Sequence, residues 1–82
     1  MYNVLFTPAY ERDYERLSLR IQRKVDQQIQ RLRIDPGHPS LRTHKRKAEP
    51  SVWQTRVTRS HRLYFRLEGD TIVLLGVGPH EK

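Results

Sequence analysis

The stretch WQTRVTRSHRLYF, residues 53–65, carries the strongest structural signal in this 82-residue chain. Neighbouring side chains of a β-strand point to opposite faces of the sheet. Two strands with this alternation would place a mainly apolar set on one face, made up of Trp53, Thr55, Val57, Leu63, Phe65 and Leu67. The other face would receive a polar and basic set, made up of Gln54, Arg56, Thr58, Arg62, Tyr64 and Arg66. The stretch therefore predicts a sheet with one buried face and one open face.

The open face of this predicted sheet carries three guanidinium groups, from Arg56, Arg62 and Arg66. A guanidinium stays charged near neutral pH, and its planar set of donors matches the oxygens of a phosphate. Such a face suits a polyphosphate ligand better than a small neutral one. Taken alone, Arg56 and Arg62 could equally be ordinary exposed strand residues.

The flanking sequence predicts an N-terminal strand, two helices and further strands. Residues 2–6 alternate, and Thr7-Pro8 is a typical helix start, with Thr7 as the N-cap. Apolar residues then recur at helical spacing on both sides of Ser18, where we expect a break. Residues 41–47 predict an edge strand or an extended loop. Gly69-Asp70 is typical of a hairpin turn, and the apolar run 71–78 predicts a strand covered on both faces.

These elements predict an α+β fold in a single domain, residues 1–82. Two antiparallel helices would pack on a mainly antiparallel, twisted sheet of three or four strands. A chain this short has room for one core and little room for a closed internal pocket, so we expect an open binding face. Tyr10 and Tyr14 lie at helical spacing, and we expect them to pack rather than to stack on bases. Trp53 is likewise expected to anchor the core.

The charge of the chain is strongly basic and unevenly distributed. The sequence holds 16 Lys and Arg against 9 Asp and Glu, a net charge of +7. Residues 1–40 carry a net charge of +2, and residues 41–82 carry +5. Basic surface of this density favours nucleic acid or an acidic protein as a partner, although a small protein can also carry a charged coat without such a partner.

Composition excludes several classes of site. There is no cysteine, which excludes a disulfide scaffold, a thiolate zinc site and a cysteine nucleophile. The four histidines lack metal-ligand spacing, so we expect neither a metal nor another cofactor. The longest apolar run, residues 72–75, is too short to cross a bilayer, and the N-terminus lacks a signal-peptide pattern. We therefore expect a cytoplasmic protein that does not contact a membrane.

The residue types suit metal-independent cleavage of RNA, in which the 2′-hydroxyl of the substrate is the nucleophile. Arg56 and Arg62 could stabilise the negative charge that develops around the phosphorus atom. His80 could transfer a proton in either direction, because an ordinary imidazole titrates near pH ~6.5. Alternation along the strand would turn His61 toward the core. The candidates for a second proton carrier are His44, Glu49, His61, Tyr64 and Glu81.

We predict that a further set of side chains binds the RNA strand. A basic cluster beside a basic sheet face commonly contacts phosphates, although it could also be a solvated loop. His80 could similarly belong to a solvated tail, since it lies two residues from the end of the sequence. The predicted RNA-binding residues are Arg42, His44, Lys45, Arg46, Lys47, Gln54, Tyr64 and Arg66.

Together these residues resemble a pattern of the RelE/ParE superfamily of toxins from toxin–antitoxin systems. The RelE-type and YoeB-type mRNA interferases carry the pattern W-x-x-R-[V/I]-T-x-x-H-R-L-x-[Y/F], followed by a hairpin and a last strand that ends at a histidine. The resemblance covers nearly the whole chain. The matching residues are Trp53, Arg56, Val57, Thr58, His61, Arg62, Leu63, Phe65 and His80.

The resemblance implies a toxin that enters the ribosomal A site and cuts mRNA, thereby inhibiting translation. It also implies a small, acidic cognate antitoxin that covers the basic face. Arg62 corresponds to the phosphate-binding arginine of the family, and Arg56 to a second basic residue of the active face. His80 falls where YoeB-like members hold a catalytic histidine. The resemblance thus assigns Arg56, Arg62 and His80 as catalytic residues.

The sequence also departs from the family pattern. Members usually have a tyrosine just beyond the histidine, where this sequence has Glu81-Lys82. The glutamate that acts as a base in YoeB-like members has no clear counterpart, and Gln54 stands where RelE-like members have a lysine. These departures support an alternative, a non-catalytic binding module on the same fold. It could be a gyrase-poisoning toxin of the ParE kind, or a degenerate domain retained for partner binding.

Overall fold

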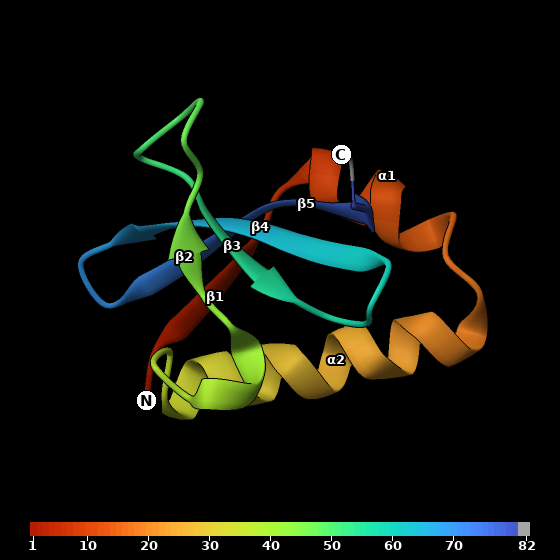
Figure 1. Ribbon diagram of the computed structural model, residues 1–82, viewed down its shortest axis with the longest axis horizontal. Coiled ribbons are helices and arrows are strands. Elements are labelled where there is room, and N and C mark those ends of the chain that lie inside the picture. The colour runs from red at the N-terminus through yellow and green to blue at the C-terminus, as the bar shows by residue number, and fades with distance from the viewer. Residues whose placement is uncertain (81–82) are drawn as a thin grey trace.

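The computed structural model describes residues 1–80 as eight elements in an α+β arrangement (Figure 1). The sheet order is β1-β5-β4-β3-β2, so the first strand lies at one edge and pairs with the last strand of the chain. The elements in chain order are β1 (Asn3–Phe6), α1 (Pro8–Glu15), α2 (Leu19–Ile34), the short 3-10 helix η1 (Pro39–Leu41), β2 (His44–Lys45), β3 (Trp53–Arg56), β4 (His61–Glu68) and β5 (Thr71–Pro79).

The sheet is larger than the sequence predicted, with five strands instead of three or four. The N-terminal strand β1 joins as an edge strand and pairs in parallel with β5, from Asn3 opposite Thr71 to Phe6 opposite Leu74. The basic segment adds the two-residue strand β2 at the other edge. The remaining three pairings are antiparallel, so the sheet is mixed. Alternation within single strands could not reveal this parallel pairing, because it joins the two ends of the sequence.

A polar side chain caps the N-terminus of each helix, and the sequence predicted the cap at Thr7. The Thr7 side chain accepts a hydrogen bond from the Tyr10 backbone N–H and donates one to the Leu74 carbonyl at 2.6 Å. This second bond fixes the corner between β1 and α1 onto β5. Ser18 caps α2 by accepting from the Ile21 N–H, which confirms the expected break. The chain turns back between α1 and α2 at residues 16–18 (Figure 1).

Both helices contribute to one hydrophobic core on the same side of the sheet. Val25, Leu32, Leu63 and Phe65 are fully buried there. Each buried side chain of this size stabilises the fold by roughly 1.5–3 kcal/mol. Tyr10 belongs to the core and Tyr14 packs against it, and so does Trp53, which confirms their predicted packing roles.

The hairpin between β4 and β5 turns at Gly69-Asp70, as predicted. Gly69 has φ +61°, whereas Asp70 does not have a positive φ, which is the arrangement of a type II′ turn. In β5, Leu74 faces the core and Val73, opposite Arg66, is buried on the other face. This arrangement confirms a strand covered on both faces over this part of its length.

The open edge of β5 beyond β1 is closed by a side chain from α1. Strand β1 pairs with β5 only as far as Leu74, so the later N–H groups on that edge lack a strand partner. The Asp13 carboxylate accepts a hydrogen bond from the Val77 N–H at 3.2 Å. Helix α1 thus completes the pairing of β5 where β1 ends. Within residues 1–80, no helix is long and apolar enough to cross a membrane.

Candidate RNA-binding face

Two rows of polar side chains cross the sheet on the face away from α2. Strand pairing places His44 opposite Gln54 and Gln54 opposite Tyr64, which forms one row across β2, β3 and β4. In the adjacent row, Arg56 lies directly opposite Arg62. The apolar residues of the same strands point the other way, since Thr55, Leu63 and Phe65 are fully buried. The alternation predicted for residues 53–65 is therefore confirmed.

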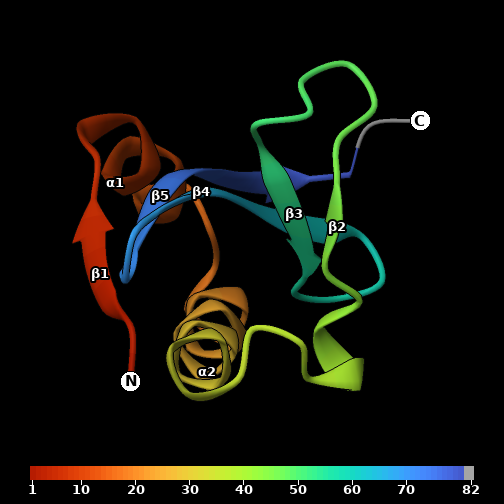
Figure 2. The same ribbon diagram turned by 90° about the vertical axis from the view of Figure 1, so that its left-hand side faces the viewer.

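The loop between β2 and β3 forms one wall of this face, and Figure 2 shows it rising away from the sheet. Backbone hydrogen bonds from Arg46 N–H to the Val52 carbonyl and from Val52 N–H to the Glu49 carbonyl fold the loop. The Arg46 guanidinium lies 4.9 Å from the centroid of the Tyr64 ring, a cation–π contact. We use the name basic face for these seven residues: His44, Arg46, Glu49, Gln54, Arg56, Arg62 and Tyr64.

The basic face contains a small open hollow with a volume of about 210 Å³. Arg46 and Glu49 line it from the loop, and Tyr64, Leu75 and Gly76 line it from the sheet. An arginine, a carboxylate and a phenol therefore meet at one place. The structure thus brings Glu49, one of the candidate proton carriers, to the face that holds the arginines.

The two opposed arginines are held in different ways. The Nη1 atom of Arg62 donates to three carbonyls of the adjoining loop, those of Thr58 at 2.9 Å, Arg59 at 3.3 Å and His61 at 3.0 Å. Arg56 is held through its backbone, because the Gln28 side chain donates to its carbonyl at 2.7 Å from α2. Its guanidinium makes no hydrogen bond or ion pair within residues 1–80. Arg56 can therefore turn fully toward a ligand, whereas Arg62 offers Nε and Nη2.

The loop between β3 and β4 is organised by the Thr58 hydroxyl. It accepts hydrogen bonds from the N–H groups of Ser60 and His61, both at 3.1 Å, and pairs with the His61 Nδ1 atom at 2.9 Å. The His61 side chain lies on the helix side of the sheet, beside Ile21 and Val77. The expectation that His61 points away from the open face is confirmed.

His80 is held at the same end of the sheet as the two arginines. Its backbone N–H donates to the Ser60 carbonyl at 2.6 Å, which continues the β4–β5 pairing past Pro79. The side chain is exposed. Residue 80 therefore lies beside the loop that Arg62 fastens. The candidate Glu81 lies outside the residues that the structure describes.

The other predicted RNA-binding residues are spread more widely. Lys45 leans over the opposite face, with its Nζ atom 5.3 Å from the centroid of the Trp53 ring. Arg66 lies toward the hairpin and pairs with Glu68 at 2.6 Å. Arg42 ends η1 in a left-handed conformation, and Lys47 is exposed in the rising loop. The structure thus brings His44, Arg46, Gln54 and Tyr64 together on the basic face. It leaves Arg42, Lys45, Lys47 and Arg66 outside that face.

Hydrogen bonding fixes the tautomer of the neutral His44 ring. Its Nδ1 atom lies 3.0 Å from the Arg42 carbonyl, which can only accept, so Nδ1 carries the proton. The Nε2 atom of this tautomer is left as an acceptor.

Within residues 1–80, no three His, Asp or Glu side chains gather as metal ligands would.

Sequence reasoning missed two roles that depend on tertiary contacts. Thr58 organises the loop beside Arg62, and the spacing Thr58–Ser60 is typical of a Thr turn that could have indicated this. Arg62 fastens the same loop, for which the sequence offers no signal. The reason is that a guanidinium reaching three carbonyls depends on the path of the loop, not on residue type.

Comparison with known proteins adds an independent finding. A family model described as the ParE toxin of the type II toxin–antitoxin system, parDE, matches residues 4–82. A search of curated proteins gave no match. Among solved structures, a YoeB/ParE toxin from Agrobacterium tumefaciens superposes with a TM-score of 0.80 at 21% identity, covering 96% of this chain and 99% of that chain.

Two further structures contain an antitoxin. The RelBE2 toxin–antitoxin complex from Mycobacterium tuberculosis superposes with a TM-score of 0.80 at 25% identity, covering 96% of this chain and 98% of that chain. The E. coli RelBE toxin–antitoxin complex superposes with a TM-score of 0.78 at 15% identity, covering all of both chains. The RelE-like fold therefore extends over the described chain.

Proposed function

Because this chain belongs to the ParE toxin family, within the RelE/ParE superfamily of type II toxins, we propose that it is a ribosome-dependent endoribonuclease that inhibits translation. Its substrate is mRNA in the ribosomal A site. The observation that carries this proposal is the basic face, where Arg56 lies opposite Arg62 beside the Arg46–Glu49–Tyr64 hollow. A strand of RNA can lie across such an open face, because its phosphates match guanidiniums and its bases can stack on an aromatic ring.

Cleavage requires a base, an acid and a stabiliser of negative charge. Glu49 takes the proton from the 2′-hydroxyl, and the 2′-oxygen forms a bond to the adjacent phosphorus. The bond from phosphorus to the 5′-oxygen breaks, and the His80 imidazolium gives a proton to that oxygen. The products are a 2′,3′-cyclic phosphate and a 5′-hydroxyl. Arg56 and Arg62 stabilise the extra negative charge on the phosphate oxygens during this exchange.

The proposed partners follow from the same face. Relatives with this fold were crystallised in complex with an antitoxin. We propose that this chain also has a small, acidic antitoxin, which neutralises it by covering the basic face. A toxin that acts on translating ribosomes works in the cytoplasm.

Primer extension on cellular mRNA after induced expression tests the proposal. We expect the wild-type chain to cut mRNA within codons, and Arg56→Ala and His80→Ala to lower cutting about 100-fold or more. The matched control is Arg23→Ala, which removes an exposed arginine from α2. It should cut as the wild type does. Equal cutting by all four proteins would show that the basic face is not the active site.

A second candidate function is the poisoning of DNA gyrase without RNA cleavage. The matching family model carries the name of the ParE toxins, and Arg62 Nη1 is already bonded to three loop carbonyls. In that case, expression would induce DNA-damage signalling while the primer-extension pattern of mRNA stays unchanged. Gyrase supercoiling assays with the purified chain would then show inhibition.

A further inference from the structure

Gln28 is a polar side chain within the buried stripe of α2. The other buried residues of that stripe are apolar, namely Ile21, Val25, Ile29 and Leu32, and Gln28 is itself only 6% exposed. A buried amide destabilises a fold unless its donors and its acceptor find partners. The partners of Gln28 therefore indicate what this residue does in the core.

One partner of Gln28 is the backbone of a proposed catalytic residue. The Gln28 Nε2 atom donates to the Arg56 carbonyl at 2.7 Å. The Oε1 atom accepts from Arg31 Nη1 at 3.2 Å, and the same Nη1 atom donates to Ser40 Oγ at 3.2 Å. A guanidinium only donates and a carbonyl only accepts, so both contacts require the same orientation of the amide. Arg31 thus helps to keep Nε2 of Gln28 turned toward Arg56.

The Arg56 carbonyl lies where β3 no longer has a partner on the β2 side. The Val57 N–H donates to the His61 carbonyl at 3.1 Å, so the backbone polar groups of Val57 face β4 and those of Arg56 face the opposite edge. Strand β2 pairs with β3 only as far as Gln54. The Gln28 amide therefore takes the place of a strand partner at the last residue of β3.

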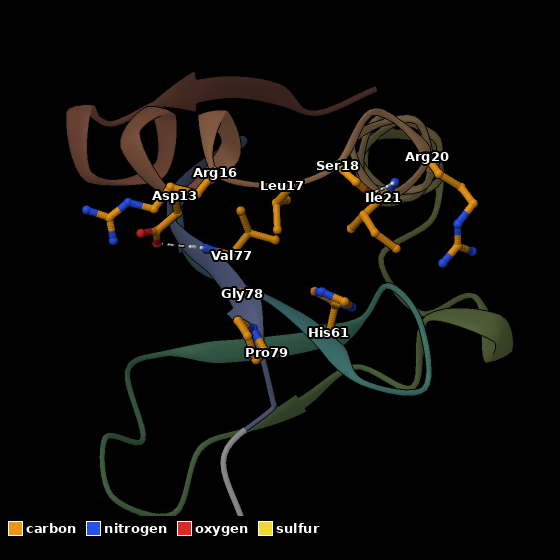
Figure 3. A pocket seen from close by; sticks show the side chains of 10 residues that line it. All are labelled: Asp13, Arg16, Leu17, Ser18, Arg20, Ile21, His61, Val77, Gly78 and Pro79. Atoms are coloured by element: carbon orange, nitrogen blue, oxygen red, sulfur yellow. Dashed lines mark hydrogen bonds between the residues drawn. The ribbon is translucent and has the colours of Figure 1, made fainter.

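The loop after Val57 is held by hydrogen bonds more than by packing. Arg59 and Ser60 are exposed. On the helix side, an open pocket of about 530 Å³ lies beside the His61 ring, where the end of α1 and the start of α2 meet the ends of β4 and β5 (Figure 3). Because neither side of the loop is tightly covered, the end of β3 can shift unless hydrogen bonds hold it.

Electrostatic repulsion acts on the same strand end. Arg56 lies directly opposite Arg62, and like charges at such a pair repel. Arg62 is fastened to loop carbonyls through its guanidinium, whereas the Arg56 side chain makes no hydrogen bond or ion pair within residues 1–80. Moving Arg56 would relieve the repulsion most easily. The hydrogen bond from Gln28 to the Arg56 carbonyl opposes that movement.

We propose that Gln28 is a positioning residue, which holds Arg56 in the alignment with Arg62 that charge stabilisation at the cleaved phosphate requires. Gln28 contacts the backbone and does not face the RNA, so it acts through Arg56. The catalytic consequence of this inference rests on the proposed function. The hold on the end of β3 does not depend on any activity.

Cleavage kinetics on ribosomes that carry a defined mRNA test the catalytic consequence. Gln28→Met keeps the approximate length and volume of the side chain and removes its amide. We expect the rate constant at saturating toxin to fall about tenfold, because a misaligned donor stabilises developing charge poorly. The toxin concentration that gives half the maximal rate should change less than about threefold, since Arg56 keeps its charge. The control is Ile29→Val, another buried change on α2, which should cut as the wild type does.

A double-substitution cycle separates positioning from general destabilisation. In an Arg56→Ala background, Gln28→Met should change the rate less than about twofold, because the residue through which it acts is gone. The proposal would be overturned by an unchanged rate for Gln28→Met alone, by an equal loss for Ile29→Val, or by a full loss that persists in the Arg56→Ala background.

Amide hydrogen exchange measures the hold on the strand end without any activity. We expect Gln28→Met to accelerate exchange of the Val57 N–H at least about tenfold more than exchange of the Val25 N–H, which lies within α2 and reports wider opening. Equal acceleration at both sites would contradict the proposed hold. Uncut mRNA with the wild-type toxin would be a failure of the proposed function, and exchange at Val57 would then decide the role of Gln28 by itself.

Discussion

Arg56 and Arg62 are directly opposed on neighbouring strands, yet only Arg62 has its guanidinium bonded to the protein. Two like charges facing each other across a strand pair repel and reduce stability. The hydrogen bonds from Arg62 Nη1 offset this repulsion by fastening the loop between β3 and β4. The pair therefore combines one arginine that is free for a ligand with one that also has a structural role.

Neutralising each arginine should change stability in opposite directions. We expect Arg56→Gln to raise the free energy of unfolding by up to about 0.5 kcal/mol, because it removes the repulsion. Arg62→Gln should lower it by about 1–2 kcal/mol, because the loop carbonyls lose a charged donor. Urea denaturation of both variants measures the difference. Equal effects would contradict the distinct roles assigned to the two residues.

The same substitutions should alter RNA binding in a salt-dependent way. Each lost phosphate contact lowers the slope of log K against log salt by roughly 0.7 for a single strand. We expect this change for Arg56→Gln, measured by fluorescence anisotropy with a short single-stranded RNA over a range of salt concentrations. Arg23→Gln on α2 serves as the control and should leave the slope unchanged. An identical slope for Arg56→Gln would remove this residue from the RNA-binding face.

Two glycines of β5 offer a matched test of the Asp13 contact. A Cβ atom added at Gly76 would lie 2.9 Å from Asp13 Oδ2, whereas one added at Gly78 meets nothing within 4 Å. We expect Gly76→Ala to displace the carboxylate from the Val77 N–H and to cost about 1–3 kcal/mol of stability. Gly78→Ala should be close to neutral. Thermal denaturation compares the two, and similar melting temperatures would show that the contact contributes little.

The backbone at Arg42 predicts an unusual preference for glycine. Arg42 has φ +50°, and it is the one non-glycine residue with a positive φ in residues 1–80. A β-branched side chain resists this left-handed conformation, so we expect Arg42→Val to destabilise the chain by about 1–2 kcal/mol. Arg42→Gly should be neutral or slightly stabilising. Urea midpoints of the three proteins provide the measurement, and a neutral valine variant would contradict the expected strain.

Stability should decline in alkaline solution because two tyrosines resist ionisation. Burial, and then the charge of Asp26, raise the pKa of Tyr10. Partial burial and the hydrogen-bonded Asp26 carboxylate, 3.0 Å away, raise the pKa of Tyr14. The folded chain then keeps protons that the unfolded chain releases above about pH 10. The contribution of both groups is thus fully present below that pH and is lost as the pH rises toward their folded pKa values.

The absorbance of ionised tyrosine, followed from neutral to alkaline pH, should show that part of the signal develops only when the chain unfolds. Unfolding experiments at the same pH values should show the matching loss of stability. Replacing both residues with phenylalanine should flatten the alkaline decline. A decline of the same size in the double variant would assign it to other groups.

Much of the fold could be predicted from local patterns because those patterns act over a few residues. Thr7-Pro8 and Ser18 start helices, Gly69-Asp70 turns a hairpin, and alternation in residues 53–65 separates buried from open side chains. The parallel pairing of β1 with β5 could not be predicted this way. It joins residues far apart in the sequence, such as Asn3 and Thr71, which are separated by 68 positions. Residues 41–47 were predicted as an edge strand or an extended loop, and the structure places the edge strand β2 at His44–Lys45, a run too short for periodicity to locate.

By itself, the sequence determined which residue types face the core and which basic residues remain on the open side, because side-chain direction follows from backbone periodicity. It also named Arg56, Arg62 and His80 as candidates through a resemblance. Only the tertiary structure decided which side chains meet. Strand register aligned Arg56 with Arg62, the folded loop brought Glu49 to Tyr64, and the meeting of two helices with two strand ends formed the open pocket beside His61. Such contacts depend on how separate elements pack, which no single stretch of sequence specifies.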